Sequence, residues 1–135
     1  MTSGYSGTPL AKKLGIKPDD TLAVLNDPGH FEDIVEPLPG RVTWRESARG
    51  KANVVVLFTK KRSELERRID SLGKMIYPNA MIWVCWPKKA SKVPTDMTED
   101  VVREVVLPKG LVDVKVCAVD DTWSGLKLMW RKELR

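Results

Sequence analysis

Residues 21–26, Thr21-Leu-Ala-Val-Leu-Asn26, decide the fold class of this chain. The run is apolar on both faces of a strand, which is typical of a central strand covered on both sides. Two similar runs follow at Ala52 to Thr59 and at Met81 to Trp86. Strands buried on both faces belong to parallel sheets flanked by helices. The sequence therefore predicts an α/β domain with a mostly parallel sheet.

Helical patterns separate these runs. Residues 31–38 place apolar side chains at i, i+3, i+4 and i+7, which predicts a helix with one apolar stripe. Ser63-Glu-Leu-Glu66 is a capping-box pattern that opens a helix ending before Pro78. Thr98 caps a further helix whose body is Val101 to Leu107. A short helix over 9–14 precedes the first strand.

The C-terminal residues change character. Val112, Val114 and Val116 alternate with polar residues or cysteine, and 126–131 alternates in the same way. Two such stretches joined by Asp120 to Ser124 predict an antiparallel hairpin with one wet face.

Length and composition favour one soluble domain. The chain has 135 residues, 42% hydrophobic and 30% charged, with no apolar run long enough to cross a membrane. We predict a lead-in with a short helix at 1–20 and a single α/β domain at 21–135. Cys85 and Cys117 both lie in strand-like segments and are interpreted as buried free thiols, which favours a cytoplasmic location. A single histidine without a Cys/His cluster predicts no metal site.

The charge is unevenly distributed. Net charge is +5, and residues 51–135 hold 17 Lys/Arg against 11 Asp/Glu. This balance permits binding to an anion or to nucleic acid, but the bases are interleaved with acids and no nucleic-acid motif occurs. A solvated basic face is the preferred interpretation.

The order of these elements resembles the class I methyltransferase-like fold. Asn53 to Phe58 resembles the fourth strand of those enzymes, Met81 to Val84 their fifth, and the final hairpin their terminal pair. The resemblance implies a three-layer, truncated methyltransferase-like Rossmann fold.

The chain resembles one family more closely, the bacterial domain-of-unknown-function 3052 family. The strings that carry the resemblance are Tyr5 to Lys17, Trp86 to Ser91, Thr98 to Arg103, Gly110 to Cys117 and Trp123 to Lys127. This resemblance implies a shared fold and assigns no activity.

The predicted second strand, Arg41 to Glu46, poses a topological question. Only five residues separate Glu46 from Ala52, whereas a parallel crossover usually needs a dozen or more. Either the second and third strands pair antiparallel, or the second strand is short and the chain runs back extended. We favour the second account because the resemblance needs it.

The resemblance implies S-adenosylmethionine bound by a Gly-rich turn after the first strand and an acid ending the second. The turn here is Asn26-Asp27-Pro28-Gly29-His30, with one glycine and a proline that lacks an N–H donor. Glu46 could be the acid, although a solvated glutamate is the preferred interpretation. We therefore expect no cofactor, and S-adenosylmethionine only if the chain is a divergent methyltransferase.

Open α/β sheets bind ligands outside the carboxyl ends of their strands. The candidate residues at this rim are Asn26, His30, Glu46, Trp86, Lys88, Lys89, Ser91, Asp120, Asp121 and Trp123, with Asp27, Thr59, Lys60 and Lys61 beside them. Lys88 and Lys89 could hold a phosphate while a ring stacks on Trp86, unless Trp86 packs in the core.

The titratable rim residues have simpler interpretations. Asp120 and Asp121 point to opposite faces if they lie on a strand, so we expect them to cap the loop or pair with Lys88 or Lys89 rather than bind a metal. His30 could be a general base, but an exposed residue at a helix start is preferred.

These observations lead to a function hypothesis with two alternatives. We expect a non-catalytic methyltransferase-like module that binds a small anionic ligand or a protein partner at the rim. The alternatives are a divergent S-adenosylmethionine-dependent methyltransferase and a nucleic-acid-binding protein. The hairpin edge also leaves room for a homodimer.

Overall fold

The computed structural model describes residues 8–135, so the expected lead-in at 1–7 lies outside the described residues. Six strands form the sheet: β1 (Thr21–Leu25), β2 (Thr43–Arg45), β3 (Ala52–Phe58), β4 (Ile76–Pro87), β5 (Leu111–Ala118) and β6 (Trp123–Trp130). The helices are α1 (Leu10–Lys13), α2 (Phe31–Val35), α3 (Arg62–Met75) and α4 (Glu99–Val106), with short 3-10 turns at Lys89–Ser91, Leu107–Lys109 and Lys132–Leu134. Within the described part, no helix is long and apolar enough to cross a membrane.

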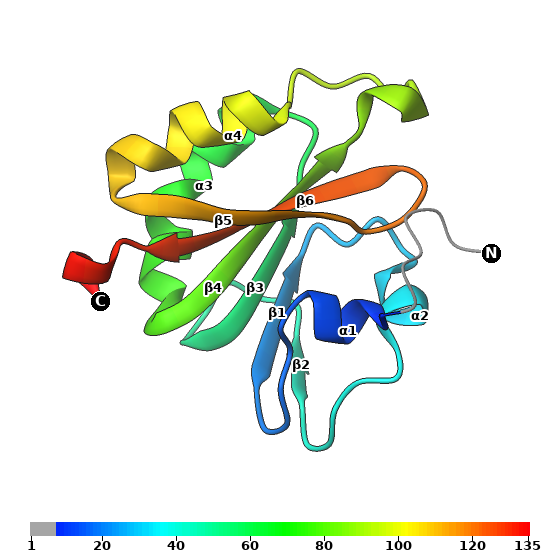
Figure 1. Ribbon diagram of the computed structural model, residues 1–135, viewed down its shortest axis with the longest axis vertical. Helices are drawn as coiled ribbons and strands as arrows, with labels where there is room; N and C mark the ends of the chain where they lie inside the picture. Colours follow the sequence, from blue (N-terminus) through cyan, green and yellow to red (C-terminus); the bar gives the residue numbers. More distant parts are fainter. Residues whose placement is uncertain (1–7) are drawn as a thin grey trace.

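The strands are ordered β2-β1-β3-β4-β6-β5. Strands β1 to β4 are mutually parallel, and β6 runs antiparallel between β4 and β5. Because β5 is antiparallel to β6, it has the direction of β4, and α4 is the crossover between them (Figure 1). The mostly parallel sheet with its C-terminal antiparallel hairpin is confirmed.

Helices cover both faces of the central strands, giving three layers (Figure 1). On one face, α3 and α4 bury residues such as Leu65, Ile69 and Val102 against the sheet. On the other, α1 and α2 bury residues such as Leu14 and Phe31. The apolar runs are fully buried because alternate side chains enter the two separate clusters.

The connection from β2 to β3 contains no helix. β2 has three residues and pairs in parallel with the first residues of β1, Thr21 with Thr43 and Ala23 with Arg45. The chain then returns over residues 46–51 to start β3 on the other side of β1. The guanidinium of Arg45 holds this return by donating to the carbonyls of Gly50 at 3.0 Å, Lys51 at 3.2 Å and Ser47 at 3.3 Å. The favoured account, a short parallel strand with an extended return, is confirmed.

Two expected helix details are wrong. The helix predicted over 31–38 ends at Val35, because Glu36 is already extended with ψ of 150°. α3 begins at Arg62, so Ser63 lies inside the helix and makes no cap hydrogen bond. Instead, the carboxylate of Asp96 accepts the Arg62 backbone N–H at 2.8 Å. Thr98 does cap α4, since its hydroxyl accepts the Val101 N–H at 3.1 Å.

The alternation predicted for the first hairpin strand is also interrupted. The register of β5 against β6 shifts between Asp113 and Lys115, which marks a bulge. One extra residue moves the following side chains to the opposite face, so 112, 114 and 116 do not form one buried row. Val114 and Val116 are 48% and 46% exposed, whereas Leu111 and Cys117 are buried.

Gly125 of β6 lies between the two cysteines. It pairs with Cys85 of β4 on one side and with Cys117 of β5 on the other, and both thiols are free and buried. The two cysteines are thus two strand spacings apart, roughly 10 Å, which is too far for a disulfide. Burial raises the pKa of the Cys85 thiol far above its ordinary value.

We predict that Gly125→Ala destabilises the protein by about 1–3 kcal/mol, the usual cost of overpacking a core. A Cβ at this position would lie 3.2 Å from the sulfur of Cys85 and 3.2 Å from a ring carbon of Trp83, which are both fully buried. Urea unfolding measures the change. Gly40→Ala is the matched control, because a Cβ there meets nothing within 4 Å. Equal stability of the two variants would contradict this packing argument.

Candidate functional site

The carboxyl ends of β1 and β3 border a hollow at the rim of the sheet. The connection after β1 leads to β2 on one side, and β3 lies on the other side, so these ends form a topological switch point, where open α/β sheets bind ligands. The hollow has a volume of about 600 Å³. It is lined by Asn26, Pro28, Phe58, Thr59, Lys60, Lys61, Ser63, Glu64, Arg67 and Trp123, and we call it the switch-point pocket.

One carboxylate joins the two strand ends. Glu64, in the first turn of α3, accepts hydrogen bonds from the Thr59 hydroxyl at 2.5 Å and from the Asn26 amide at 2.9 Å. Arg68 lies one helical turn further, with its Nη1 4.0 Å from the Glu64 carboxylate. Asn26 adopts a left-handed φ of 57°, a conformation that asparagine tolerates better than most residues. The Glu64 charge is therefore already engaged by the protein.

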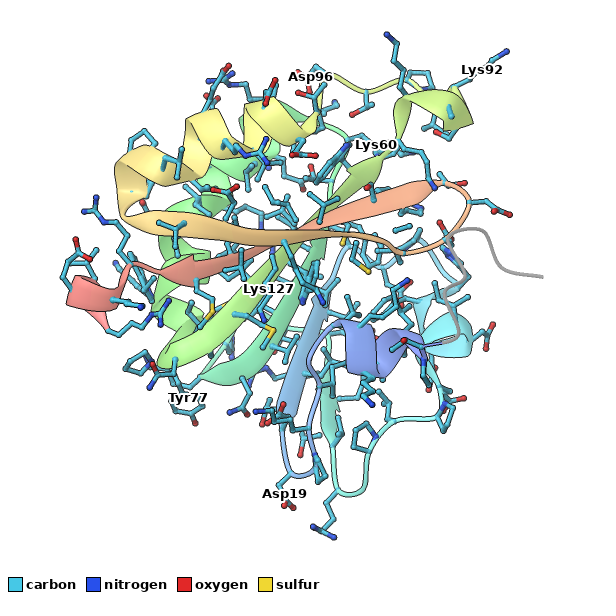
Figure 2. All side chains as sticks on the ribbon, in the orientation of Figure 1. Asp19, Lys60, Tyr77, Lys92, Asp96 and Lys127 are labelled. Carbon is cyan, nitrogen blue, oxygen red and sulfur yellow. The ribbon has the colours of Figure 1, made fainter. Side chains whose placement is uncertain are left out.

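Three basic side chains line the same pocket and remain unpaired. Lys60, Lys61 and Arg67 are exposed, and within residues 8–135 their side chains form no hydrogen bond or ion pair. Lys60 lies at the carboxyl edge of the sheet, below the start of α4 in the view of Figure 2. Three cations against one engaged carboxylate give the pocket an excess positive charge. The pocket is thus suited to an anion.

Aromatic rings form the apolar wall of the pocket. Phe58 and Trp123 meet edge to face with centroids 5.1 Å apart, and Phe31 meets Phe58 in the same way at 5.3 Å. Trp44 of β2 extends the row, 6.1 Å from Phe31. The row crosses from β2 to β6 and holds the wall rigid.

The turn after β1 closes on itself. The carboxylate of Asp27 accepts the N–H groups of Gly29 at 2.8 Å and Phe31 at 3.3 Å, and Pro28 has no N–H to offer. Glu46 is exposed, accepts the indole N–H of Trp44 at 3.1 Å, and does not line the pocket. The turn therefore has few free donors for a cofactor, and Glu46 has a local partner.

A hydrogen bond between His30 and Asp120 joins the turn after β1 to the hairpin loop. The second oxygen of Asp120 accepts the N–H groups of Thr122 at 2.8 Å and Trp123 at 2.7 Å, so it caps the loop as expected. His30 was predicted to be exposed and is instead hydrogen-bonded to Asp120. No sequence pattern indicates this contact, because the two residues are 90 positions apart. Within the described chain, neither Asp120 nor the exposed Asp121 pairs with Lys88 or Lys89.

The hydrogen bonds to Asp120 also affect its ionisation. Burial alone would raise the pKa of this carboxyl group, but hydrogen bonds from Trp123, His30 and Thr122 outweigh burial and lower the pKa below its ordinary value. Asp120 is therefore held as a carboxylate and keeps Trp123 in the pocket wall.

The remaining rim candidates lie around a separate hollow of about 550 Å³ on the α4 side. Trp86 is 5% exposed and packs in the core, with Lys88 and Lys89 beside it on the rim of this hollow. Ser91 instead donates its hydroxyl to the Lys88 carbonyl at 2.7 Å and does not line the hollow. The structure thus divides the predicted rim: Asn26 and Trp123 line one hollow and Trp86, Lys88 and Lys89 the other.

Sequence reasoning missed Glu64 and Arg67. Both lie within the first two turns of α3, and only three residues separate this helix from the end of β3. A helix that follows a parallel strand so closely places its first turns at the strand end. That short spacing was the available signal. Among residues 8–135, no cluster of three or more His, Cys, Asp or Glu side chains could hold a metal ion.

No known protein family matches the sequence, and no curated protein does. Solved structures do match. An S-adenosylmethionine-dependent methyltransferase from Aquifex aeolicus is 13% identical, with 89% of this chain and 87% of that chain covered and a TM-score of 0.59. The N-methyltransferase NodS from Bradyrhizobium japonicum, solved with S-adenosylhomocysteine, is 13% identical, with 91% and 83% covered and a TM-score of 0.56.

A third similar structure is the magnesium protoporphyrin IX methyltransferase from Synechocystis with bound S-adenosylmethionine. It is 9% identical, with 90% of this chain and 74% of that chain covered and a TM-score of 0.58. The likeness extends over nearly the whole chain at very low identity. The methyltransferase-like fold is therefore shown.

We predict that Asp120→Asn lowers the free energy of unfolding at neutral pH by roughly 1–2 kcal/mol, the range for hydrogen bonds to a charged group. A carboxyl group whose pKa is lowered by folding stabilises the protein above its unfolded pKa of about 3.9, and this contribution is lost as the pH falls through the folded value. The difference between the proteins should shrink below about pH 4. Urea unfolding across pH measures it.

The control for this prediction is Asp121→Asn, because Asp121 is adjacent and exposed. It should leave stability nearly unchanged at every pH. If Asp120→Asn lowers the free energy of unfolding equally at every pH, the carboxylate charge does not stabilise the protein.

Proposed function

We propose that this protein is a non-catalytic methyltransferase-like module that binds a small molecule carrying both an acidic group and a flat ring in the switch-point pocket. The observation that carries the proposal is the set of three unpaired cations, Lys60, Lys61 and Arg67, around a hollow of about 600 Å³. A hollow of this volume fits a nucleotide-sized ligand.

The lining supports each part of this ligand class. Guanidinium and ammonium groups bind phosphate or carboxylate through charge-assisted hydrogen bonds, and Arg67 can do so in a bidentate manner. Phe58 and Trp123, 2% and 7% exposed, contribute the apolar atoms of the wall against which a ring would pack. Thr59 and Asn26 are held by Glu64, so they shape the pocket floor. Small nucleoside phosphates combine both required features.

A divergent methyltransferase is the second candidate, supported by the likeness to three methyltransferases, two of them solved with S-adenosylmethionine or its demethylated product. Two local features favour the first proposal. In the turn after β1, the N–H groups of Gly29 and Phe31 already donate to the Asp27 carboxylate. The pocket also carries an excess of positive charge. The sulfonium of S-adenosylmethionine is itself a cation, so like charges would meet at this site.

Other proposals rest on separate observations. Membership of the domain-of-unknown-function 3052 family rests on the quoted strings alone, because no family match accompanies them. The two free, buried cysteines support a cytoplasmic location. The unpaired edge of β5, with exposed Val114 and Val116, supports a homodimer, and a protein partner remains an alternative occupant of the rim.

We predict that adenosine 5′-monophosphate or uridine 5′-monophosphate binds saturably in isothermal titration, while the uncharged nucleosides bind at least tenfold more weakly. The double variant Lys61→Ala/Arg67→Ala should lose at least tenfold in affinity, because each charge-assisted hydrogen bond contributes about 1.5–3 kcal/mol. Lys132→Ala, an exposed lysine in the C-terminal turn, is the matched control and should bind as the unaltered protein does. Equal affinity for nucleotide and nucleoside would contradict the proposal.

For the second candidate, we predict no saturable heat with S-adenosylmethionine or S-adenosylhomocysteine in the micromolar range. Glu46→Gln serves as a probe, because a ribose-binding acid would lower affinity when neutralised. Micromolar binding that is weakened by this substitution would establish the methyltransferase candidate instead.

A further inference from the structure

Two lysines lie opposite each other on the β5–β6 hairpin, and the charge of a third lysine repels one of them. Lys127 of β6 is the register partner of Lys115 of β5, so the two lie directly opposite each other across the strands. Lys17 lies in the loop between α1 and β1, and its charge repels the ammonium group of Lys127. We call these three residues the lysine cluster. Figure 2 shows Lys127 near the middle of the sheet, between β6 and α1.

Packing around Trp83 brings the three segments together. Trp83 of β4 is the other register partner of Lys127, and it is fully buried. Its indole N–H donates to the carbonyl of Leu14 at 2.9 Å, which fixes the loop that leads to Lys17. Lys127 is half-buried in this arrangement. Burial, and then repulsion from Lys115 and Lys17, lower the pKa of its ammonium group.

No carboxylate neutralises the cluster. Within residues 8–135, none of the three lysines forms an ion pair with an acid. Asp113, on the same strand as Lys115, is held by Arg103 at 2.9 Å. Asp19, the nearest acid in sequence to Lys17, pairs with Arg41, and the carboxylate of Asp20 accepts the Lys17 backbone N–H at 2.9 Å.

This arrangement is costly for the free protein. Like charges directly opposite each other on paired strands are destabilising, and partial burial adds to the cost. The fold does not require lysine here, since alternate positions on β6 carry Gly125 and Met129. Ionisable groups perturbed by burial and by neighbouring charges cluster at functional sites.

We propose that the lysine cluster is a binding site for a chain of phosphate groups, either a small polyphosphate or the backbone of a nucleic-acid strand. Several cations on three segments match several linked anionic groups better than one monoanion. The site is separate from the switch-point pocket, because Lys127 lies four residues along β6 from Trp123, about 13 Å at ~3.3 Å per residue.

The test uses Lys127→Met, which keeps the length of the side chain and removes its charge. In low salt without phosphate, the midpoint of thermal unfolding should rise by about 1–4 °C, because the repulsion is removed. Added tripolyphosphate should raise the midpoint of the Lys61→Ala/Arg67→Ala variant, in which two pocket cations are removed, and adding Lys127→Met to that variant should nearly abolish the rise. Lys115→Met should behave in the same direction. Lys132→Met, outside the cluster, is the matched control and should keep the full response to tripolyphosphate.

Two further arms identify the phosphate source and separate this site from the pocket. Fluorescence anisotropy with single-stranded oligothymidylate, at several salt concentrations, should show salt-sensitive binding if the source is nucleic acid. Binding of tripolyphosphate alone assigns a small polyphosphate. Lys61→Ala/Arg67→Ala should retain either response, even if it abolishes nucleotide binding.

A lower midpoint for Lys127→Met without phosphate, together with an undiminished rise on adding tripolyphosphate when Lys127→Met is combined with Lys61→Ala/Arg67→Ala, would overturn the proposal. Absence of binding to both probes would do so as well.

Discussion

Burial of both faces of β1, β3 and β4 is the constraint on which the rest of the structure depends. Val54, Val55 and Val56 are all fully buried, although successive side chains point to opposite faces. Such strands cannot expose functional groups along their length, so polar chemistry is confined to the strand ends and to the less covered hairpin. The switch-point pocket and the lysine cluster occupy these two locations.

The central fold could be predicted because apolar runs and turn residues report directly on strands covered on both sides. Features that depend on contacts between distant segments could not. The bulge at 113–115 depends on how β5 meets β6, and the parallel direction of β2 was expected from the fold resemblance alone. The pair of His30 and Asp120 joins segments 90 residues apart, and nothing local to either residue indicates it.

The candidate site shows how a shared scaffold can acquire different local chemistry. The turn after β1 satisfies its own N–H groups through Asp27, and Glu64 ties the ends of β1 and β3 together. The charged groups that remain unpaired at this edge are Lys60 and Lys61, just before α3, and Arg67 on α3. A rigid aromatic row from Trp44 to Trp123 supports this edge from the opposite face. The scaffold therefore fixes where a ligand can bind, and the side chains at the edge decide which ligand.

The helix-free return between β2 and β3 has a consequence for how this architecture can change. Residues 46–51 are all exposed, and the Arg45 guanidinium binds three of their backbone carbonyls. Exposed tips of this kind accept added sequence, because new residues there displace no packed side chain. Extra secondary structure, or a whole inserted domain, can enter between Ala48 and Arg49 without altering strand order. Residues 46–51 are thus a site where both evolutionary insertions and engineered reporter domains can be accommodated.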